Sequence, residues 1–167
     1  MIDPVRIQEA AIHKSDENYE FCDFLKQNAD GGQLDSQFAQ LHNELFASYD
    51  CSKCGNCCRE YTVSVTKNEV GPIASHLKMA PKEFTKKYLE PFGKEYLLNE
   101  PCPFLASDGK CSIYICKPEV CTSFPSTGKP GGLASIYSCV SMIEVCPIVY
   151  EIFEQLKEIY GFTYLSD

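Results

Sequence analysis

Apolar residues recur at helical spacing in the N-terminal third of the chain. One set repeats at intervals of four, three and four residues: Leu34, Phe38, Leu41 and Leu45. That spacing places the four side chains on one face of a helix. We therefore predict that residues 1–50 are helical, in two pieces that separate at Gly31-Gly32, because adjacent glycines commonly mark breaks.

A second amphipathic pattern lies near the C-terminus. Its members repeat at intervals of four, three, four and three residues: Val145, Val149, Ile152, Leu156 and Ile159. Gly161 follows this set, and glycine is the residue that most often terminates a helix. The pattern predicts a C-terminal helix within residues 147–167.

Shorter patterns follow one another between these helical ends. Residues 61–65 alternate in the manner of a strand. Thr66 and Glu69 form a capping-box signature, which predicts a helix from that point to about residue 78. Pro81 stands where the first residue of another helix is expected, and this helix is predicted to end at residues 91–93.

Turn residues dominate the next stretch of the chain. Ser107-Asp108-Gly109 predicts a turn that closes a short hairpin over residues 103–114. A hairpin of this length would bring Cys102 close to Cys111.

Pro118 is expected to open a single helical turn that presents Cys121. Residues 127–132 contain glycine and proline and are predicted to form a loop. The apolar residues of 133–137 then predict a second strand, which would end near Cys139.

Helical ends around an irregular centre predict an α+β fold: a small cysteine-rich metal-binding centre with short strands, enclosed by N- and C-terminal helices. The length of 167 residues is close to that of one ordinary domain. We expect a single domain over residues 1–167. Its parts are a helical N-terminal extension (1–50), a cysteine-cluster core (51–146) and a C-terminal helix (147–167).

Eleven cysteines are an odd number, so they cannot all pair within one molecule. The first residues lack the basic-then-apolar pattern of a signal peptide, and no apolar run approaches the ~20 residues of a membrane-spanning helix. We therefore expect the cytoplasm, where disulfides are disfavoured. The net charge of −8 also argues against binding to nucleic acid or to an anionic membrane.

Four cysteines lie within eight residues, in a C-x2-C-x2-C-C run: Cys51, Cys54, Cys57 and Cys58. A C-x2-C step lets a tight turn direct two sulfur atoms at one metal, and Gly55 provides the backbone freedom for such a turn. Ferredoxin-type runs use the same step twice around one cluster. The run therefore predicts a metal or iron–sulfur site.

A second group of cysteines lies farther along the chain: Cys102, Cys111, Cys116 and Cys121, with Cys139 and Cys146 as outliers. Distant groups that join around a metal are a common way for a small metal-binding domain to close its fold. Cys22 stands apart from both groups, and we expect it to be a small buried residue. Cys116 is interpreted as an accessory thiol.

The ordered set of motifs resembles a known family. The matching segments are C-x2-C-G-x-C-C at 51–58, Pro-Cys-Pro-Phe-Leu at 101–105, Gly-Lys-Cys-Ser-Ile-Tyr at 109–114 and Lys-Pro-Glu-Val-Cys-Thr-Ser-Phe-Pro at 117–125. They are similar to the CxxCxxCC cysteine-cluster proteins (the YkgJ type), described as zinc- or iron-chelating domains. Lys117 and Thr122 depart from the family pattern, which usually has arginine at both positions.

The resemblance implies a set of metal ligands. They are Cys51, Cys54, Cys57, Cys58, Cys102, Cys111 and Cys121, with Cys139 or Cys146 completing the set. Eight thiolates would fill two four-sulfur sites. Adjacent side chains diverge in extended backbone, so Cys57 and Cys58 would serve different sites unless one remains a free thiol.

The C-x2-C-x2-C run favours an iron–sulfur cluster, most simply [4Fe–4S], over Zn²⁺, because zinc sites usually take cysteines in pairs. The first functional hypothesis is a protein with one or two such sites in a redox, electron-transfer or sensing role, with a redox or protein partner. The second is a structural or metal-handling zinc protein that acts through partner binding. A cluster-dependent transferase ranks third, and the sequence leaves enzymatic activity open.

Overall fold

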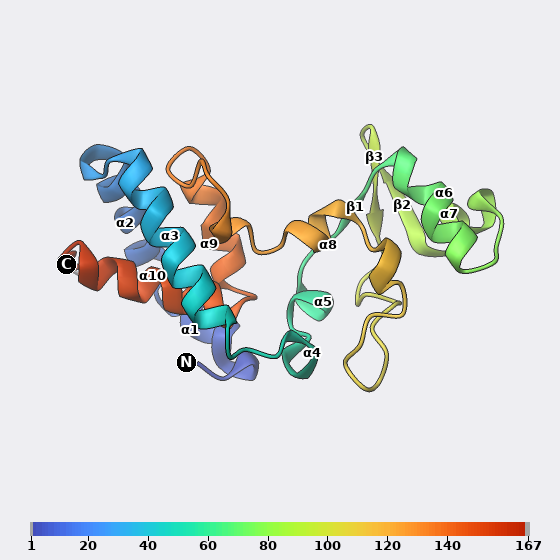
Figure 1. The fold of residues 1–167 in the computed structure, drawn as a ribbon, viewed down its shortest axis with the longest axis horizontal. Coiled ribbons are helices and arrows are strands. Elements are labelled where there is room, and N and C mark those ends of the chain that lie inside the picture. Colours follow the sequence, from blue (N-terminus) through green and yellow to red (C-terminus); the bar gives the residue numbers. More distant parts are fainter. Residues whose placement is uncertain (1, 166–167) are drawn as a thin grey trace. The chain divides into compact units, whose positions relative to one another are not determined.

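The computed structural model describes residues 2–165, apart from the side chain of Ser52. Two compact units can be distinguished (Figure 1). Residues up to 50 and from 125 onward form the helical unit, and residues 51–124 form the cysteine unit. The combination of many helices with a small antiparallel sheet confirms the α+β class. Residues 125–146 pack with the helices of the two chain ends in the helical unit.

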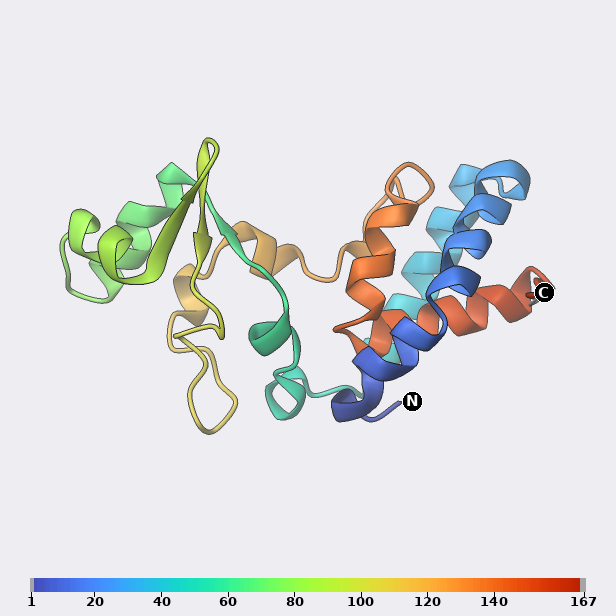
Figure 2. The same ribbon diagram turned by 180° about the vertical axis from the view of Figure 1, so that it is seen from behind.

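The helical unit joins both ends of the chain. Its elements are η1 (Pro4–Arg6), α1 (Ile7–His13), α2 (Ser15–Asn28), α3 (Gly31–Phe46), η3 (Ser126–Gly128), α9 (Ile136–Ile143) and α10 (Pro147–Ile159). Helix α10 packs against α3 and α9, and α2 also packs against α9 (Figure 2). The buried ring of Phe153 lies 6.0 Å from that of Phe21 and 6.2 Å from that of Phe38, measured between centroids. The amphipathic faces predicted at the two ends therefore share one core.

A lysine is buried inside this unit. Nζ of Lys157 donates hydrogen bonds of 2.8 Å to Oε1 of Glu17, Oδ1 of Asn18 and Oε1 of Glu154. Lys14 donates to the other carboxylate oxygen of Glu154. These bonds compensate the loss of hydration that a buried ammonium suffers.

The glycine pair at 31–32 begins a helix rather than interrupting one. Helix α2 ends at Asn28, and α3 starts at Gly31 after a short extended link. Asp30 is the N-cap, because its Oδ1 accepts the N–H of Gln33 at 2.8 Å. This capping bond explains why the break precedes the glycines.

The segment that enters the helical unit at residue 125 is fastened to α3. Asp35 accepts the backbone N–H groups of Gly131 at 2.9 Å and Gly132 at 2.8 Å. Nδ1 of His42 lies 2.9 Å from Oγ1 of the buried Thr127. Side chains of α3 thus satisfy the polar groups of this loop, as buried and partly buried groups require.

The strand predicted over residues 133–137 is wrong. Residues 132–135 form turns, and α9 begins at Ile136. In α9 the buried residues Ile136, Cys139, Val140 and Ile143 follow helical spacing. The helical period of this longer stretch outweighs the strand propensity of a few residues at its start.

The cysteine unit has a helical and a sheet part. Its elements are α4 (Cys51–Cys54), α5 (Cys57–Glu60), β1 (Ser64–Val65), α6 (Lys67–His76), α7 (Pro81–Tyr88), β2 (Leu89–Phe92), β3 (Glu95–Leu98), η2 (Tyr114–Cys116) and α8 (Glu119–Ser123). The strands form an antiparallel sheet in the order β1-β3-β2, with Val65 opposite Tyr96 and Leu89 opposite Leu98. Helices α6 and α7 pack against each other.

Several local predictions in this unit are confirmed. The Thr66–Glu69 capping box starts α6, and Pro81 starts α7. The predicted strand over 61–65 is present as the shorter β1. Residues 91–93, however, do not follow directly on a helix end: α7 stops at Tyr88, and Gly93, with φ of +58°, forms the turn of the β2–β3 hairpin.

No helix within residues 2–165 has both the length and the apolar composition needed to cross a lipid bilayer.

Candidate metal centre

The two cysteine motifs of the cysteine unit are joined through their backbones. The N–H of Cys102 donates to the carbonyl oxygen of Cys58 at 3.1 Å. Phe104, two residues later, is buried and stacks on Phe84 of α7 with ring centroids 6.1 Å apart. The start of the second motif is therefore fixed on one side to the first motif and on the other to the apolar core.

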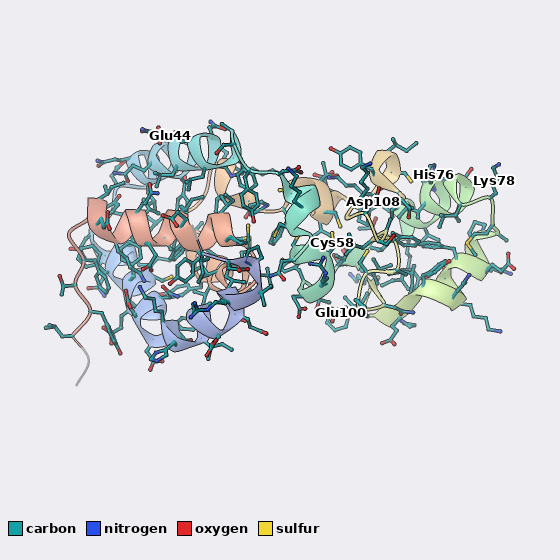
Figure 3. The ribbon with its side chains drawn as sticks, turned by 90° about the horizontal axis from the view of Figure 1, so that it is seen from below. Glu44, Cys58, His76, Lys78, Glu100 and Asp108 are labelled. Atoms are coloured by element: carbon teal, nitrogen blue, oxygen red, sulfur yellow. The ribbon has the colours of Figure 1, made fainter. Side chains whose placement is uncertain are left out.

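The predicted hairpin holds Cys111 near Cys102. Leu105 and Cys111 form an antiparallel bridge, and the N–H of Ala106 donates to the carbonyl of Lys110 at 2.8 Å. Gly109, with φ of +81°, makes the turn between them. Asp108, at this turn, is labelled in Figure 3 together with Cys58 on α5. Burial raises the pKa of the Cys102 thiol, and the nearby Cys58 and Cys111 contribute to that rise.

Helix α8 presents Cys121, as predicted. The helix begins directly after Pro118, whose carbonyl accepts the N–H of Cys121 at 3.0 Å. Glu69, the capping residue of α6, fixes the start of α8, because its Oε1 accepts the N–H of Glu119 at 2.6 Å. The other oxygen of Glu69 accepts the N–H and the hydroxyl of Thr66, each at 2.7 Å. One carboxylate therefore ties α8 to the first turn of α6.

Four thiols lie close enough to interact electrostatically: Cys58, Cys102, Cys111 and Cys121, which we call the inner thiols. Burial, together with the other three inner thiols, raises the pKa of Cys121 to about 12. Cys102, Cys111 and Cys121 are all partly buried against the apolar core of the unit. The structure thus brings together sulfur atoms from three separate segments.

Cys58 differs from Cys102 and Cys121 in that its thiol pKa is lowered. A hydrogen bond from the side chain of Cys57 lowers its pKa to about 6, although burial acts in the opposite direction. The positive charges of Arg59 and Lys117 add to the effect. A thiolate is the form that binds a metal, so this residue needs little rearrangement of protons to become a ligand.

The remaining cysteines of this unit are Cys51, Cys54, Cys57 and Cys116. Cys51 is exposed, whereas Cys54, Cys57 and Cys116 are half-buried. Gly55 has a φ of +58° and forms the turn after Cys54, as its place in the C-x2-C step predicted. Cys116 is packed against the same apolar core as Cys102, Cys111 and Cys121. Burial raises the pKa of its thiol, and Cys111 contributes to that rise. Sequence analysis gave it no role as a ligand, although it lies midway between Cys111 and Cys121.

Three cysteines belong to the helical unit. Cys22 is fully buried, as predicted, and its Sγ lies 3.8 Å from the carbonyl oxygen of Ile136. Cys139 is buried in α9, where burial raises its pKa to about 12 and its thiol raises that of Cys22. Cys146 is buried at the start of α10. The expectation that Cys139 or Cys146 completes the ligand set stays a prediction.

The donor set fits a soft metal. Thiolates are the preferred ligands of Zn²⁺ and of iron–sulfur clusters, and a four-cysteine set serves either one. Among the described residues, no group of three or more histidine, cysteine or acidic side chains has an arrangement that could hold a metal ion directly. The inner thiols are therefore neighbours that would have to draw closer around a metal.

Comparison with known proteins gives one family and a partial relative. A family model described as "CxxCxxCC: Putative zinc- or iron-chelating domain" matches residues 50–147. "Uncharacterized protein MJ0661" from Methanocaldococcus jannaschii is 36% identical over 83 residues. That match covers 47% of this chain and 44% of the relative, so the chain corresponds to less than half of that protein's length. No solved structure matches the chain.

Proposed function

Because the chain belongs to the CxxCxxCC family of zinc- or iron-chelating domains, we propose that the cysteine unit holds an iron–sulfur cluster and serves a redox, electron-transfer or sensing role. The observation that carries this proposal is the proximity of the four inner thiols, which come from three separate segments. Four cysteines are the usual ligands of a [4Fe–4S] cluster. Such a cluster would supply reversible one-electron transfer.

The number and spacing of thiols favour a cluster over one zinc ion. The cysteine unit contains eight cysteines, twice the number that a tetrahedral zinc site takes. Cys51, Cys54 and Cys57 repeat the C-x2-C step of ferredoxin-type runs. These three thiols are candidates for a second centre, with Cys116 of the same unit as a fourth ligand.

The distribution of charge bears on the choice of partner. The helical unit has fifteen acidic and five basic residues, whereas the cysteine unit has eight acidic and ten basic residues. The negative charge of the chain therefore belongs to the helical unit. A basic redox partner would be attracted to the helical unit, and an acidic one to the cysteine unit.

A structural or metal-handling zinc protein is the second candidate, since the family description includes zinc. In that case the inner thiols would form a closed four-sulfur site whose main effect is to stabilise the cysteine unit. The cluster-dependent transferase and the cytoplasmic location stay predictions from the sequence.

Anaerobic purification followed by metal and sulfide analysis tests the proposal. We expect iron and acid-labile sulfide in comparable amounts, with a brown colour and absorbance at about 400 nm. A colourless protein with stoichiometric zinc and no sulfide would support the second candidate instead. Folded protein that lacks both metals after anaerobic isolation would contradict both candidates.

A further inference from the structure

We propose that Arg59 is a positioning residue for the metal centre. Its side chain holds the C-x2-C turn of residues 51–54 in place and provides positive charge beside the thiolates. This inference rests on the proposed function only in requiring that the cysteine unit bind a metal through these cysteines. It concerns a residue that lies outside the cysteine set.

Arg59 links the two short helices that carry the first motif. Its Nη1 donates to the carbonyl oxygen of Cys54 at 2.9 Å. Its own backbone N–H bonds to the carbonyl of Asn56 at 2.9 Å, which fixes its place in α5. Helices α4 and α5 have four residues each, too few to be stable without further contacts. The side-chain bond of Arg59 is such a contact.

The guanidinium also lies directly on the turn between these helices. Gly55 is buried, and a Cβ atom built on it would lie 3.3 Å from Nη2 of Arg59. Its φ of +58° is a conformation that residues with a side chain adopt reluctantly. The N–H of Gly55 donates to the carbonyl of Cys51 at 2.9 Å and closes the turn. Arg59 therefore covers a turn whose geometry sets the spacing of Cys51 and Cys54.

Charge gives the second part of the argument. Four thiolates exceed the charge of a divalent ion, so a four-cysteine centre is anionic. The hydrogen bond to the carbonyl of Cys54 places the positive charge of Arg59 beside the first cysteine motif. Lys117 is held beside the site by Tyr114, because its Nζ lies 4.5 Å from the centre of that ring. Arg59 and Lys117 thus bring positive charge from different motifs of the cysteine unit.

An arginine that only stabilises a helix end would have a different signature from a positioning residue. It would change the stability of the cysteine unit without changing the reduction potential of a bound cluster. Residues that orient metal ligands typically alter metal affinity by about 10–100-fold when they are replaced. Metal release and reduction potential are therefore the two informative measurements.

The test compares Arg59→Gln and Arg59→Lys with Lys94→Gln, which removes the same charge from an exposed turn of the same unit. Each protein is loaded anaerobically to equal metal content. The rate of metal loss to an excess chelator and the midpoint potential are then measured. We expect Arg59→Gln to lose metal at least about 10-fold faster than wild type. We also expect a lower reduction potential for Arg59→Gln, because the reduced cluster loses the positive charge that stabilises the added electron.

Arg59→Lys separates the two effects. It keeps the charge but cannot reproduce the geometry of the guanidinium, so we expect a potential near that of wild type and metal loss that is still accelerated. Lys94→Gln should match wild type in both measurements. Equal behaviour of Arg59→Gln and wild type would overturn the inference, and so would equal effects of Arg59→Gln and Lys94→Gln.

The proposed function and this inference fail in distinguishable ways. Wild-type protein that contains zinc and no sulfide contradicts the cluster, but the chelator measurement still tests Arg59. Wild-type protein with a cluster, together with an Arg59→Gln variant that matches it, contradicts only the positioning role.

Discussion

The backbone N–H of Cys102 donates to the carbonyl of Cys58 at 3.1 Å, so the second cysteine motif is bonded directly to the last cysteine of the first motif. This bond involves no thiol. It brings distant segments together through the peptide backbone and leaves both side chains available to a metal. The approach of the inner thiols is thus built into the fold of the cysteine unit.

Replacement of an inner thiol should remove metal. We expect Cys121→Ser to lose most of the bound metal and to lower solubility, because the remaining inner thiols would no longer give the metal a full set of ligands. Cys54→Ser and Cys57→Ser should also lose metal, as the C-x2-C run predicts. Metal content by mass spectrometry checks this.

Cys22→Ala is the matched control for these variants, because Cys22 is fully buried in the helical unit. It should keep the metal content of wild type while it loses some stability from a small cavity, about 1 kcal/mol. Equal metal content in Cys22→Ala and Cys121→Ser would contradict the assignment of Cys121 as a ligand.

Glu69→Ala should loosen the helix that presents Cys121. The substitution removes the acceptor of three hydrogen bonds, from Thr66 and from the N–H of Glu119. We expect a loss of about 1–3 kcal/mol in unfolding free energy. Hydrogen exchange at the Glu119 amide should accelerate. Glu83→Ala, which removes the longer 3.4 Å capping bond of α7, should have a smaller effect on urea unfolding.

Lys157→Met should destabilise the helical unit strongly. It leaves Glu17, Asn18 and Glu154 without the donor that they share. Removal of one partner from a buried ion pair typically costs about 3–5 kcal/mol, and partial exposure of the two glutamates should keep the loss near the lower value. Thermal unfolding measures it. Lys26→Met, at an exposed position, removes only a cation–π contact with Tyr137 and should cost no more than about 1 kcal/mol.

Acid should weaken the same network. Burial alone would raise the pKa of Glu154, but hydrogen bonds from Lys14 and Lys157 outweigh it and lower that pKa below the ordinary value of 4.5. A lowered carboxyl pKa contributes stability at pH values above 4.5, and this contribution is lost as the pH falls through the folded-state value. Unfolding free energy measured against pH should therefore decline less steeply below 4.5 in Glu154→Gln than in wild type. Parallel curves would contradict this account.

Sequence patterns predicted the parts of the fold that depend on local chemistry. The capping box at Thr66 and Glu69 and the helix stop at Gly161, where φ is +61°, are each decided by a few neighbouring residues. The β2–β3 hairpin was missed, because Pro91 and Gly93 end a helix and turn a hairpin equally well. Only the pairing of β3 with β1 separates the two possibilities, and that pairing is not local.

The candidate site was predictable in its donors but not in its surroundings. The turn at 107–109 correctly indicated that Cys102 and Cys111 lie close together. The bond from Arg59 to Cys54 could not be inferred, since the sequence pattern does not specify the partner of an exposed arginine. Its role depends on the left-handed turn at Gly55, which the sequence indicates only as a possibility.

Both ends of the cysteine unit lead into the helical unit, where Asp35 of α3 binds the loop that follows residue 125. Formation of the helical unit therefore closes residues 51–124 into a loop. Closure of a loop of this length costs about 4 kcal/mol of chain entropy. Packing of the helices offsets this entropy. A metal then binds cysteines whose chain is already held at both ends.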